Sequence, residues 1–250
     1  LLSLIKKFKI FFVVLLSLLI ANNSNLINQM DEHSDNYRYM NALEIGQSWI
    51  KNNTNDVEVL WRLAQIHFDI ADQSEDPAVH KEHFYPGLGY AKKALDLNSK
   101  SARANHWYAV LIGKIGIIEG TEQKIINSYD VKKYSEIAIS LDPDYDGTYH
   151  LMGRWHFNIA DLSWIERSIA SWVYATPPDG TFEEAVQFFE KAIKAKNDEI
   201  RHYVWLGNSY YELSDYKNAE KAWRDALKIA PKSESDKILI NQAKETLADL

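Results

Sequence analysis

The fold is decided by the stretch Tyr203-Val-Trp-Leu-Gly-Asn-Ser-Tyr210, continued by Tyr216-Lys-Asn-Ala219, Trp223, Ala226 and Pro231. Its aromatic residues and Leu206 are expected to be buried knobs, while Gly207, Ala219 and Ala226 are small enough for two helices to cross closely. Pro231 is typical of the residues that end a helix. The stretch therefore predicts a helical hairpin, and because one hairpin cannot bury its apolar face alone, it requires neighbours.

This hairpin is similar to a tetratricopeptide repeat of about 34 residues. Its ending, an apolar helix that closes with alanine and is followed by a turn, recurs upstream at Ala94, Ala138 and Ala192. The expected fold class is therefore all-α, a tetratricopeptide-repeat-like right-handed superhelix of about four hairpins with capping helices. The hairpins are expected at residues 57–99, 102–143, 146–197 and 200–231.

The spacing of the hairpins is uneven. The closing alanines, Ala94, Ala138, Ala192 and Ala226, lie 44, 54 and 34 residues apart, so the second and third hairpins are enlarged. We assign the extra residues to 113–133 and 158–181. Insertions in repeat proteins are often binding elements, although these two could simply lengthen the helices and pack locally.

The repeat domain is expected to span residues 35–250. Residues 39–51 have helical apolar spacing and resemble the second helix of a partial leading repeat. At the other end, residues 235–249 place Ile240, Ala243 and Leu247 on one stripe, as expected of a capping helix. Residues 22–34 are expected to be a linker.

Residues 1–21 differ from the rest of the chain. Lys6, Lys7 and Lys9 precede an apolar run of twelve residues that ends at Ala21. This pattern is typical of a secretory signal peptide, which predicts export to the periplasm or the extracellular space. The alternative is an uncleaved anchor, in which case membrane contact would be made only through residues 1–21.

Composition limits the function classes. The chain lacks cysteine, which removes disulfides, thiol catalysis and thiolate zinc sites. Without its first 21 residues it has 25 basic and 35 acidic residues, a formal charge of −10. This balance argues against general nucleic-acid binding.

Several stretches go beyond a generic repeat. They are His106-Trp-Tyr-Ala-Val110, Glu119-Gly120, His150-Leu-Met-Gly-Arg-Trp155, Ala175-Thr-Pro-Pro178 and Thr181-Phe-Glu-Glu-Ala185. Over roughly residues 40–250 the chain resembles the regulator of microtubule dynamics family. The resemblance implies a repeat scaffold without an established catalytic centre, whose animal members are linked to microtubules and organelle membranes. The signal-like N-terminus and the Lys-, Ile- and Asn-rich composition suggest a bacterial member, where that partner would be absent.

In stacked hairpins the first helices line the concave face, so residues offset from Ala64, Ala109, Gly153 and Gly207 are expected to point into a groove. The partner-binding candidates are Trp61, Gln65, Phe68, Arg103, His106, His150, Arg154, Phe157, Arg201, Asn208 and Tyr211. None of them is acidic, and three are arginines. They favour an anionic partner, such as an acidic peptide. The alternative is that the arginines pair with acids on neighbouring helices and only hold the repeats together.

Motifs with catalytic or metal-binding chemistry are absent from the sequence. No nucleophile elbow, phosphate-binding glycine loop or metalloprotease motif occurs. His80 and His83 are three residues apart, but they are expected in a solvated loop inside the first hairpin. Asp142 begins a run like a calcium loop, yet Gly153 stands where the loop needs a bidentate Glu. We therefore predict no catalytic residues, no metal and no cofactor.

These observations predict a non-enzymatic scaffold that binds a protein or peptide, of acidic character, in its concave groove. The alternative is a membrane-anchored or self-associating organiser of an envelope or organelle-membrane complex. The sequence does not fix the oligomeric state.

Overall fold

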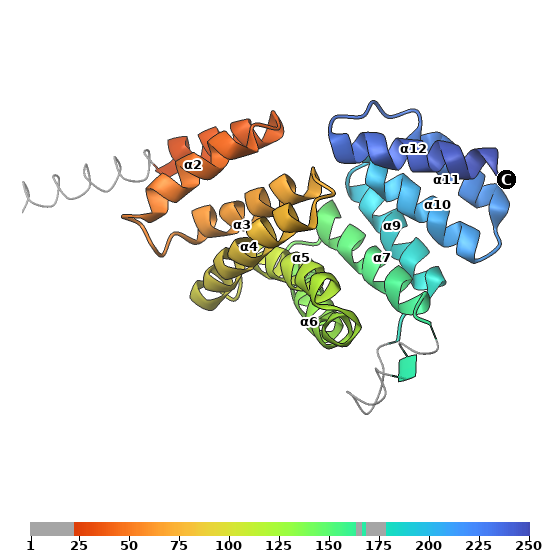
Figure 1. The fold of residues 1–250 in the computed structure, drawn as a ribbon, viewed down its shortest axis with the longest axis horizontal. Helices are drawn as coiled ribbons and strands as arrows, with labels where there is room; N and C mark the ends of the chain where they lie inside the picture. Colours follow the sequence, from red (N-terminus) through yellow and green to blue (C-terminus); the bar gives the residue numbers. More distant parts are fainter. Residues whose placement is uncertain (1–22, 164–166, 169–178) are drawn as a thin grey trace, which may run out of the picture.

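The computed structural model describes residues 23–163, 167–168 and 179–250, and all the regular structure in these ranges is helical. Figure 1 shows the helices following one another in an arch, with α2 and α12 at its two ends. Four hairpins form the body of the arch. Their helices are α3 (Val57–Asp72), α4 (Pro77–Leu97), α5 (Ala102–Glu119), α6 (Thr121–Leu141), α7 (Asp146–Ala160), α9 (Phe182–Ala195), α10 (Ile200–Glu212) and α11 (Tyr216–Ala226). The chain is thus an all-α helical superhelix.

Several helices begin where short polar side chains cap them. The Asp56 carboxylate accepts hydrogen bonds from the backbone N–H groups of Glu58 and Val59, and Ser101 caps α5 in the same way. Each cap satisfies backbone donors that have no partner within the helix. Ser233 and Asp236 form a reciprocal capping box at the start of α12 (Glu234–Ala248).

Within the last two hairpins, a glycine on the first helix faces an aromatic ring on the second. A Cβ atom built on Gly207 would lie 2.4 Å from Nε1 of Trp223, and one on Gly153 would lie 2.6 Å from the ring of Phe189. Trp223 is 1% exposed, and its indole N–H donates to the Val204 carbonyl at 3.2 Å and to Asn208 Oδ1 at 3.0 Å. The absent side chains let the paired helices approach closely enough to bury these rings.

The first insertion lengthens helices rather than forming a separate loop. Helices α5 and α6 have 18 and 21 residues, and residues 113–133 lie at their adjoining ends. Most of the second insertion, 158–181, lies outside the described residues. His80 and His83 are not in a loop as expected: α4 has 21 residues and includes both, because Asp76 and Pro77 start the helix early. His83 Nδ1 lies 3.1 Å from Nδ1 of His67.

The expected linker is also corrected. Residues 23–35 are helical, and Met30 is fully buried in a cluster with Leu43 and Leu63. Asp31 pairs with Arg62 on α3 at 2.7 Å. This segment and α2 (Tyr39–Ile50) together make a leading helix pair that covers α3. The sequence pattern had assigned only the second of these helices to the array.

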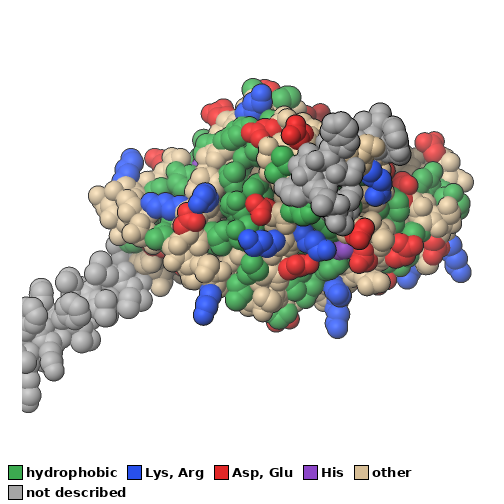
Figure 2. Space-filling view, turned by 90° about the horizontal axis from the view of Figure 1, so that it is seen from below, with side chains coloured by type: hydrophobic (Ala, Val, Ile, Leu, Met, Phe, Trp, Pro, Cys, Tyr) green, Lys and Arg blue, Asp and Glu red, His purple; other side chains and the backbone are tan. Residues whose placement is uncertain are grey.

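The predicted signal peptide or anchor, residues 1–21, lies outside the described residues. Among the helices that the structure does describe, none combines the length and the apolar character needed to cross a bilayer. Figure 2 shows acidic and basic side chains interspersed among hydrophobic ones on one face of the molecule. The charge of this face is therefore mixed rather than of a single sign.

The close crossing of α10 and α11 can be tested with Gly207→Ala. The added methyl group would overlap the Trp223 ring, so we expect a loss of roughly 1–3 kcal/mol in the free energy of unfolding. Gly89→Ala on α4 is the matched control. Its Cβ would meet nothing within 4 Å, so this variant should gain about 0.5–1 kcal/mol. Denaturant unfolding measures both, and an equally tolerated Gly207→Ala would contradict the packing described.

Candidate functional site

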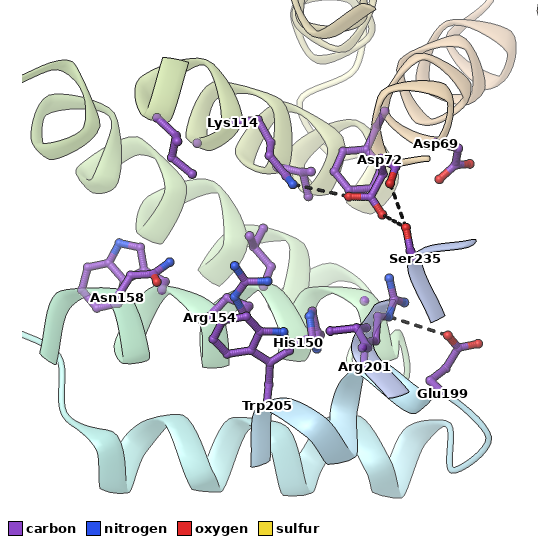
Figure 3. Close-up of a pocket in the computed structure, with 18 of the residues that line it drawn as sticks. Asp69, Asp72, Lys114, His150, Arg154, Asn158, Glu199, Arg201, Trp205 and Ser235 are labelled. Carbon is purple, nitrogen blue, oxygen red and sulfur yellow. Dashed lines mark hydrogen bonds and ion pairs between the residues drawn. The ribbon is translucent and has the colours of Figure 1, made fainter. Parts of the chain in front are cut away.

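The first helices of the hairpins and the start of α12 enclose a cavity of about 560 Å³ on the inside of the arch. Figure 3 shows its polar side chains facing one another from α3, α5, α7 and α10. Apolar residues contribute a second part of the lining, among them Phe68, Trp107, Val110, Leu151 and Leu239. A cavity of this size with a few convergent polar groups is the usual form of a ligand site.

Helix α7 supplies a row of polar side chains to one wall. His150, Arg154 and Asn158 are four residues apart, so they lie on one face of the helix, and all three line the cavity. The Arg154 guanidinium stacks over the ring of Trp205, with Cζ 3.6 Å from the ring centroid. Its Nε is buried without a hydrogen-bond partner. Burial lowers the pKa of Arg154 to about 10, with Asp72 opposing the shift.

Helix α3 supplies an acidic wall. Asp69 and Asp72 both line the cavity, which corrects the expectation that the concave face holds no acid. Asp72 lies 3.5 Å from the Lys114 ammonium, a second basic group of the cavity. Burial lowers the pKa of Lys114, and Asp72 counteracts this effect.

Asp69 carries the most displaced acid pKa of the cavity. Burial, and next the charge of Asp72, raise its pKa from 3.8 to about 7, while a hydrogen bond from Gln65 and the charge of Arg201 lower it. In the described part of the chain Asp69 has no ion pair within salt-bridge distance. Its carboxyl group is therefore only partly ionised at neutral pH, and we call its charged form uncompensated because it has no ion pair in the described part of the chain.

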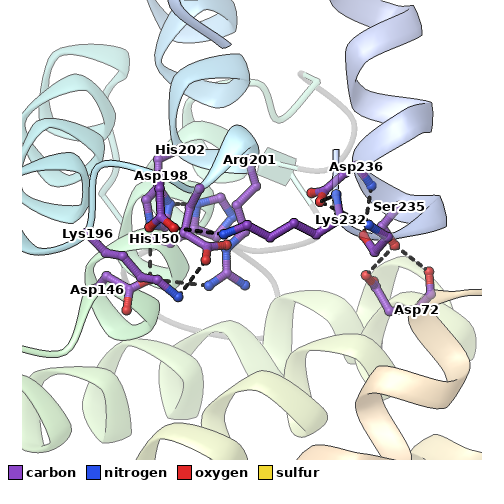
Figure 4. Close-up of polar contacts among 12 residues, drawn as sticks. Asp72, Asp146, His150, Lys196, Asp198, Arg201, His202, Lys232, Ser235 and Asp236 are labelled. Carbon is purple, nitrogen blue, oxygen red and sulfur yellow. Dashed lines mark hydrogen bonds and ion pairs between the residues drawn. The ribbon is translucent and has the colours of Figure 1, made fainter. Parts of the chain in front are cut away.

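A hydrogen-bonded chain fixes the side chain of His150. His202 Nε2 lies 3.0 Å from Asp146 Oδ2, and His202 Nδ1 lies 3.1 Å from His150 Nδ1 (Figure 4). Burial lowers the pKa of both histidines, so both are neutral near pH 7. Because Asp146 must accept, His202 donates through Nε2 and accepts at Nδ1 from His150. His150 then keeps Nε2 as a hydrogen-bond acceptor.

Arg201 belongs to the same polar network. One of its terminal nitrogens, Nη2, lies 3.3 Å from Asp146 Oδ2, and its Nε lies 3.7 Å from Glu199 Oε2. These pairs, together with Arg103–Asp142 at 3.6 Å, give two of the three predicted arginines partners on the protein itself. Arg103 and Arg201 thus fit the alternative in which the arginines pair with acids of the protein itself. Arg154 does not fit it.

The start of α12 closes one side of the cavity. Ser235 Oγ donates to Asp72, 2.8 Å from its carbonyl oxygen and 2.9 Å from Oδ2, as drawn in Figure 4. The Glu234 N–H donates to Gln73 Oε1 at 3.1 Å. These contacts join residues more than 160 positions apart. The helix expected only to cap the last repeat therefore also returns to the first hairpin.

Five of the eleven predicted site residues line the cavity: Phe68, His106, His150, Arg154 and Arg201. His106 is buried and shares a hydrogen bond with the Thr148 hydroxyl, 3.1 Å from Nδ1. The other six contact the protein elsewhere: Trp61 and Phe157 in apolar clusters, Gln65 beside Asp69, Arg103 over the Tyr145 ring, Asn208 on Trp223, and Tyr211 against Tyr216.

Sequence reasoning missed several polar residues of the cavity and assigned Trp205 to the core. Asp69, Asp72, Lys114 and Asn158 are among those missed. Lys114 and Asn158 lie in the two insertions, so the uneven repeat spacing carried a signal for them. Asp69 lies four residues beyond Gln65, and this spacing could have found it.

The described residues contain no group of three or more His, Asp or Glu side chains placed to hold a metal ion. The charged and titratable groups of the cavity include arginine, lysine, histidine and carboxylate side chains, with Asp69 and Asp72 on α3 and Arg154 on α7. Such groups bind charged or polar ligands by ion pairs and hydrogen bonds.

The stacked hairpins with an internal cavity define a tetratricopeptide-repeat-like protein. A thermophilic tetratricopeptide-repeat protein of Thermus thermophilus superposes with a TM-score of 0.66 at 14% identity, covering 89% of this chain and 98% of that one. MamA superposes with a TM-score of 0.50 at 18% identity, over 82% and 90% of the two chains. These likenesses establish the fold.

The chain belongs to the regulator of microtubule dynamics protein 1–3 family, whose model matches residues 26–250. Regulator of microtubule dynamics protein 1 of Bos taurus is 37% identical over 196 residues, covering 78% of this chain and 62% of the relative. Protein 3 of Xenopus laevis is 38% identical over 135 residues, covering 54% and 29%. The chain thus spans less than two thirds of the length of these relatives.

The uncompensated charge of Asp69 predicts a pH-dependent stability. Because its pKa is higher in the folded chain (about 7) than its ordinary value (3.8), its contribution to stability falls as the pH rises through this window. Asp69→Asn removes this loss. The free energy of unfolding of the Asp69→Asn variant, relative to that of the unsubstituted chain, should increase by roughly 1–3 kcal/mol between about pH 5 and about pH 8.5.

Denaturant unfolding at the two pH values measures the difference. Asp96→Asn is the control, since Asp96 is exposed and pairs with Lys92 at 2.7 Å. A relative stability of Asp69→Asn that is the same at both pH values would contradict the assignment.

Proposed function

We propose that the protein is a non-enzymatic scaffold that holds a segment of a partner polypeptide in the cavity, with an acidic group of the partner on Arg154. The observation that carries this proposal is the state of Arg154. It stacks on Trp205, its Nε has no hydrogen-bond partner, and it forms no ion pair in the described part of the chain. An arginine held in this way offers a planar donor group to a carboxylate.

The energetics favour such a partner. A half-buried cation without a counter-ion has lost part of its hydration, which a carboxylate in the cavity would replace with a charge-assisted hydrogen bond. The Trp205 ring fixes the guanidinium plane, so less side-chain entropy is lost on binding. Arg154 therefore gains more from an anionic partner than an exposed arginine would.

The apolar lining supports a polypeptide as the partner. Phe68, Trp107 and Val110 present apolar surface close to the polar row of α7. A peptide segment can place an apolar side chain against this surface while its acidic group reaches Arg154. Family membership is compatible with the scaffold role, since the fold separates readily from any particular partner.

A second candidate comes from the names of the relatives, which are regulators of microtubule dynamics. For this chain we propose as the alternative a structural organiser that self-associates or acts at a membrane. Size-exclusion chromatography with light scattering tests self-association, and co-sedimentation with polymerised tubulin tests a microtubule role.

On the sequence pattern of residues 1–21 alone, we also propose that they direct export. N-terminal sequencing of the protein isolated from its host tests this proposal. Cleavage after Ala21 supports a signal peptide, and an intact N-terminus in a membrane fraction supports an anchor.

The scaffold proposal predicts that Arg154→Glu weakens partner binding without unfolding the protein. Polypeptides retained by the immobilised chain from a host extract are quantified for the unsubstituted protein and for the variant. We expect at least a 10-fold reduction, about 1.4 kcal/mol, because the reversed charge repels an acidic partner. Arg224→Glu is the control, since Arg224 is exposed on α11 and pairs only with Glu220. If Arg154→Glu retains every partner at the original level, the proposal is wrong.

A further inference from the structure

Two uncompensated charges of opposite sign face the same cavity. Arg154 on α7 has no ion pair, and neither has Asp69 on α3, within the described residues. Both side chains are labelled in Figure 3, where they lie on opposite sides of the site. Both residues are half-buried, and since half-buried charges that face a cavity are usually paired, two unpaired ones point to a ligand that supplies both counter-ions.

Three neighbouring charges of the cavity are already engaged. Lys114 and Asp72 pair with each other at 3.5 Å, and Asp72 also accepts a hydrogen bond from Ser235. Arg201 approaches Asp69 closely enough to lower its pKa, but its guanidinium is held by Asp146 and Glu199. Lys114, Asp72 and Arg201 thus have ion-pair partners within the protein, whereas Arg154 and Asp69 have none among the described residues.

We infer that the cavity selects a partner segment that carries both an acidic and a basic side chain, the acidic one bound to Arg154 and the basic one to Asp69. This inference rests on the proposed function and deepens it, because it names the charge pattern of the partner. The apolar lining between the two charges then receives an uncharged side chain of the same segment.

The pattern gives selectivity as well as affinity. A purely acidic segment would satisfy Arg154 but bring a further negative charge into a cavity where Asp69 and Asp72 already repel each other. A purely basic segment would meet Arg154, Lys114 and Arg201 with the wrong sign. Like charges brought together in a poorly hydrated site reject the wrong partner, so only the mixed segment avoids both costs.

The same pattern explains why the chain keeps a destabilising carboxylate. Asp69 has a raised pKa because its charged form is disfavoured in the free protein. An ammonium or guanidinium group placed beside it would stabilise that form. Strain of this kind is common at binding sites, where groups are arranged for a ligand rather than for the stability of the free protein.

The test is selection of a random dodecapeptide display library on the full chain, in parallel with Asp69→Asn and Arg154→Met. We expect the unsubstituted chain to enrich peptides with one acidic and one basic residue at a fixed separation. Asp69→Asn should lose the preference for the basic residue and keep that for the acidic one, and Arg154→Met should do the reverse. Asp96→Asn and Arg224→Met are the matched controls on exposed sites and should select the same peptides as the unsubstituted chain.

A peptide from this selection then allows a double-mutant cycle between its basic residue and Asp69. Replacing its basic residue with glutamine should weaken binding to the unsubstituted chain by about 10-fold and leave binding to Asp69→Asn unchanged. Enrichment of peptides with acidic residues alone would overturn this inference and leave the proposed function standing. If no peptide is enriched over the background, both fail. Circular dichroism of each variant confirms that the selections compare folded proteins.

Discussion

The close approach of the two helices in a hairpin is the constraint on which the rest of the structure depends. Gly153 and Gly207 leave room for the rings of Phe189 and Trp223, and these buried rings fix how α7 and α10 sit on their partners. The face opposite the glycine contacts is then directed into the arch. Arg154 directly follows Gly153, and Trp205 lies two residues before Gly207. Fixing the two helices therefore brings the Arg154 guanidinium onto the Trp205 ring.

The cavity is bounded by residues from both ends of the array because the array returns on itself. The first turn of α12 meets the end of α3 through Ser235, Asp72 and Gln73, a connection made by polar contacts. It places an acidic helix end from the first hairpin in the same cavity as the polar row of the third, which carries Arg154. The charges of the cavity therefore come from parts of the sequence that no single repeat contains.

Much of the fold could be predicted from the sequence, because small and aromatic residues recur at the hairpin crossings. Counting residues from the small residues at these crossings also found Arg154 and His150, since both are offset from Gly153 on one helix. It misplaced Asn208, whose side chain turns to Trp223 inside its own hairpin. It could not find the role of Asp72, because the pairing of Asp72 with Ser235 depends on a long-range closure. Likewise the helix at residues 23–35 owes its stability to tertiary contacts of Met30 and Asp31 rather than to a local pattern.

In the free protein Asp69 lacks the cationic group that a bound partner would supply. Carbon-13 NMR of the aspartate carboxyl groups, titrated with and without a selected mixed-charge peptide, measures this directly, and Asp69→Asn assigns the signal. We expect a pKa near 7 for Asp69 in the free chain, and a pKa lowered to or below the ordinary aspartate range in the complex. An Asp69 signal that titrates identically with and without the bound peptide would contradict the role given to this carboxylate.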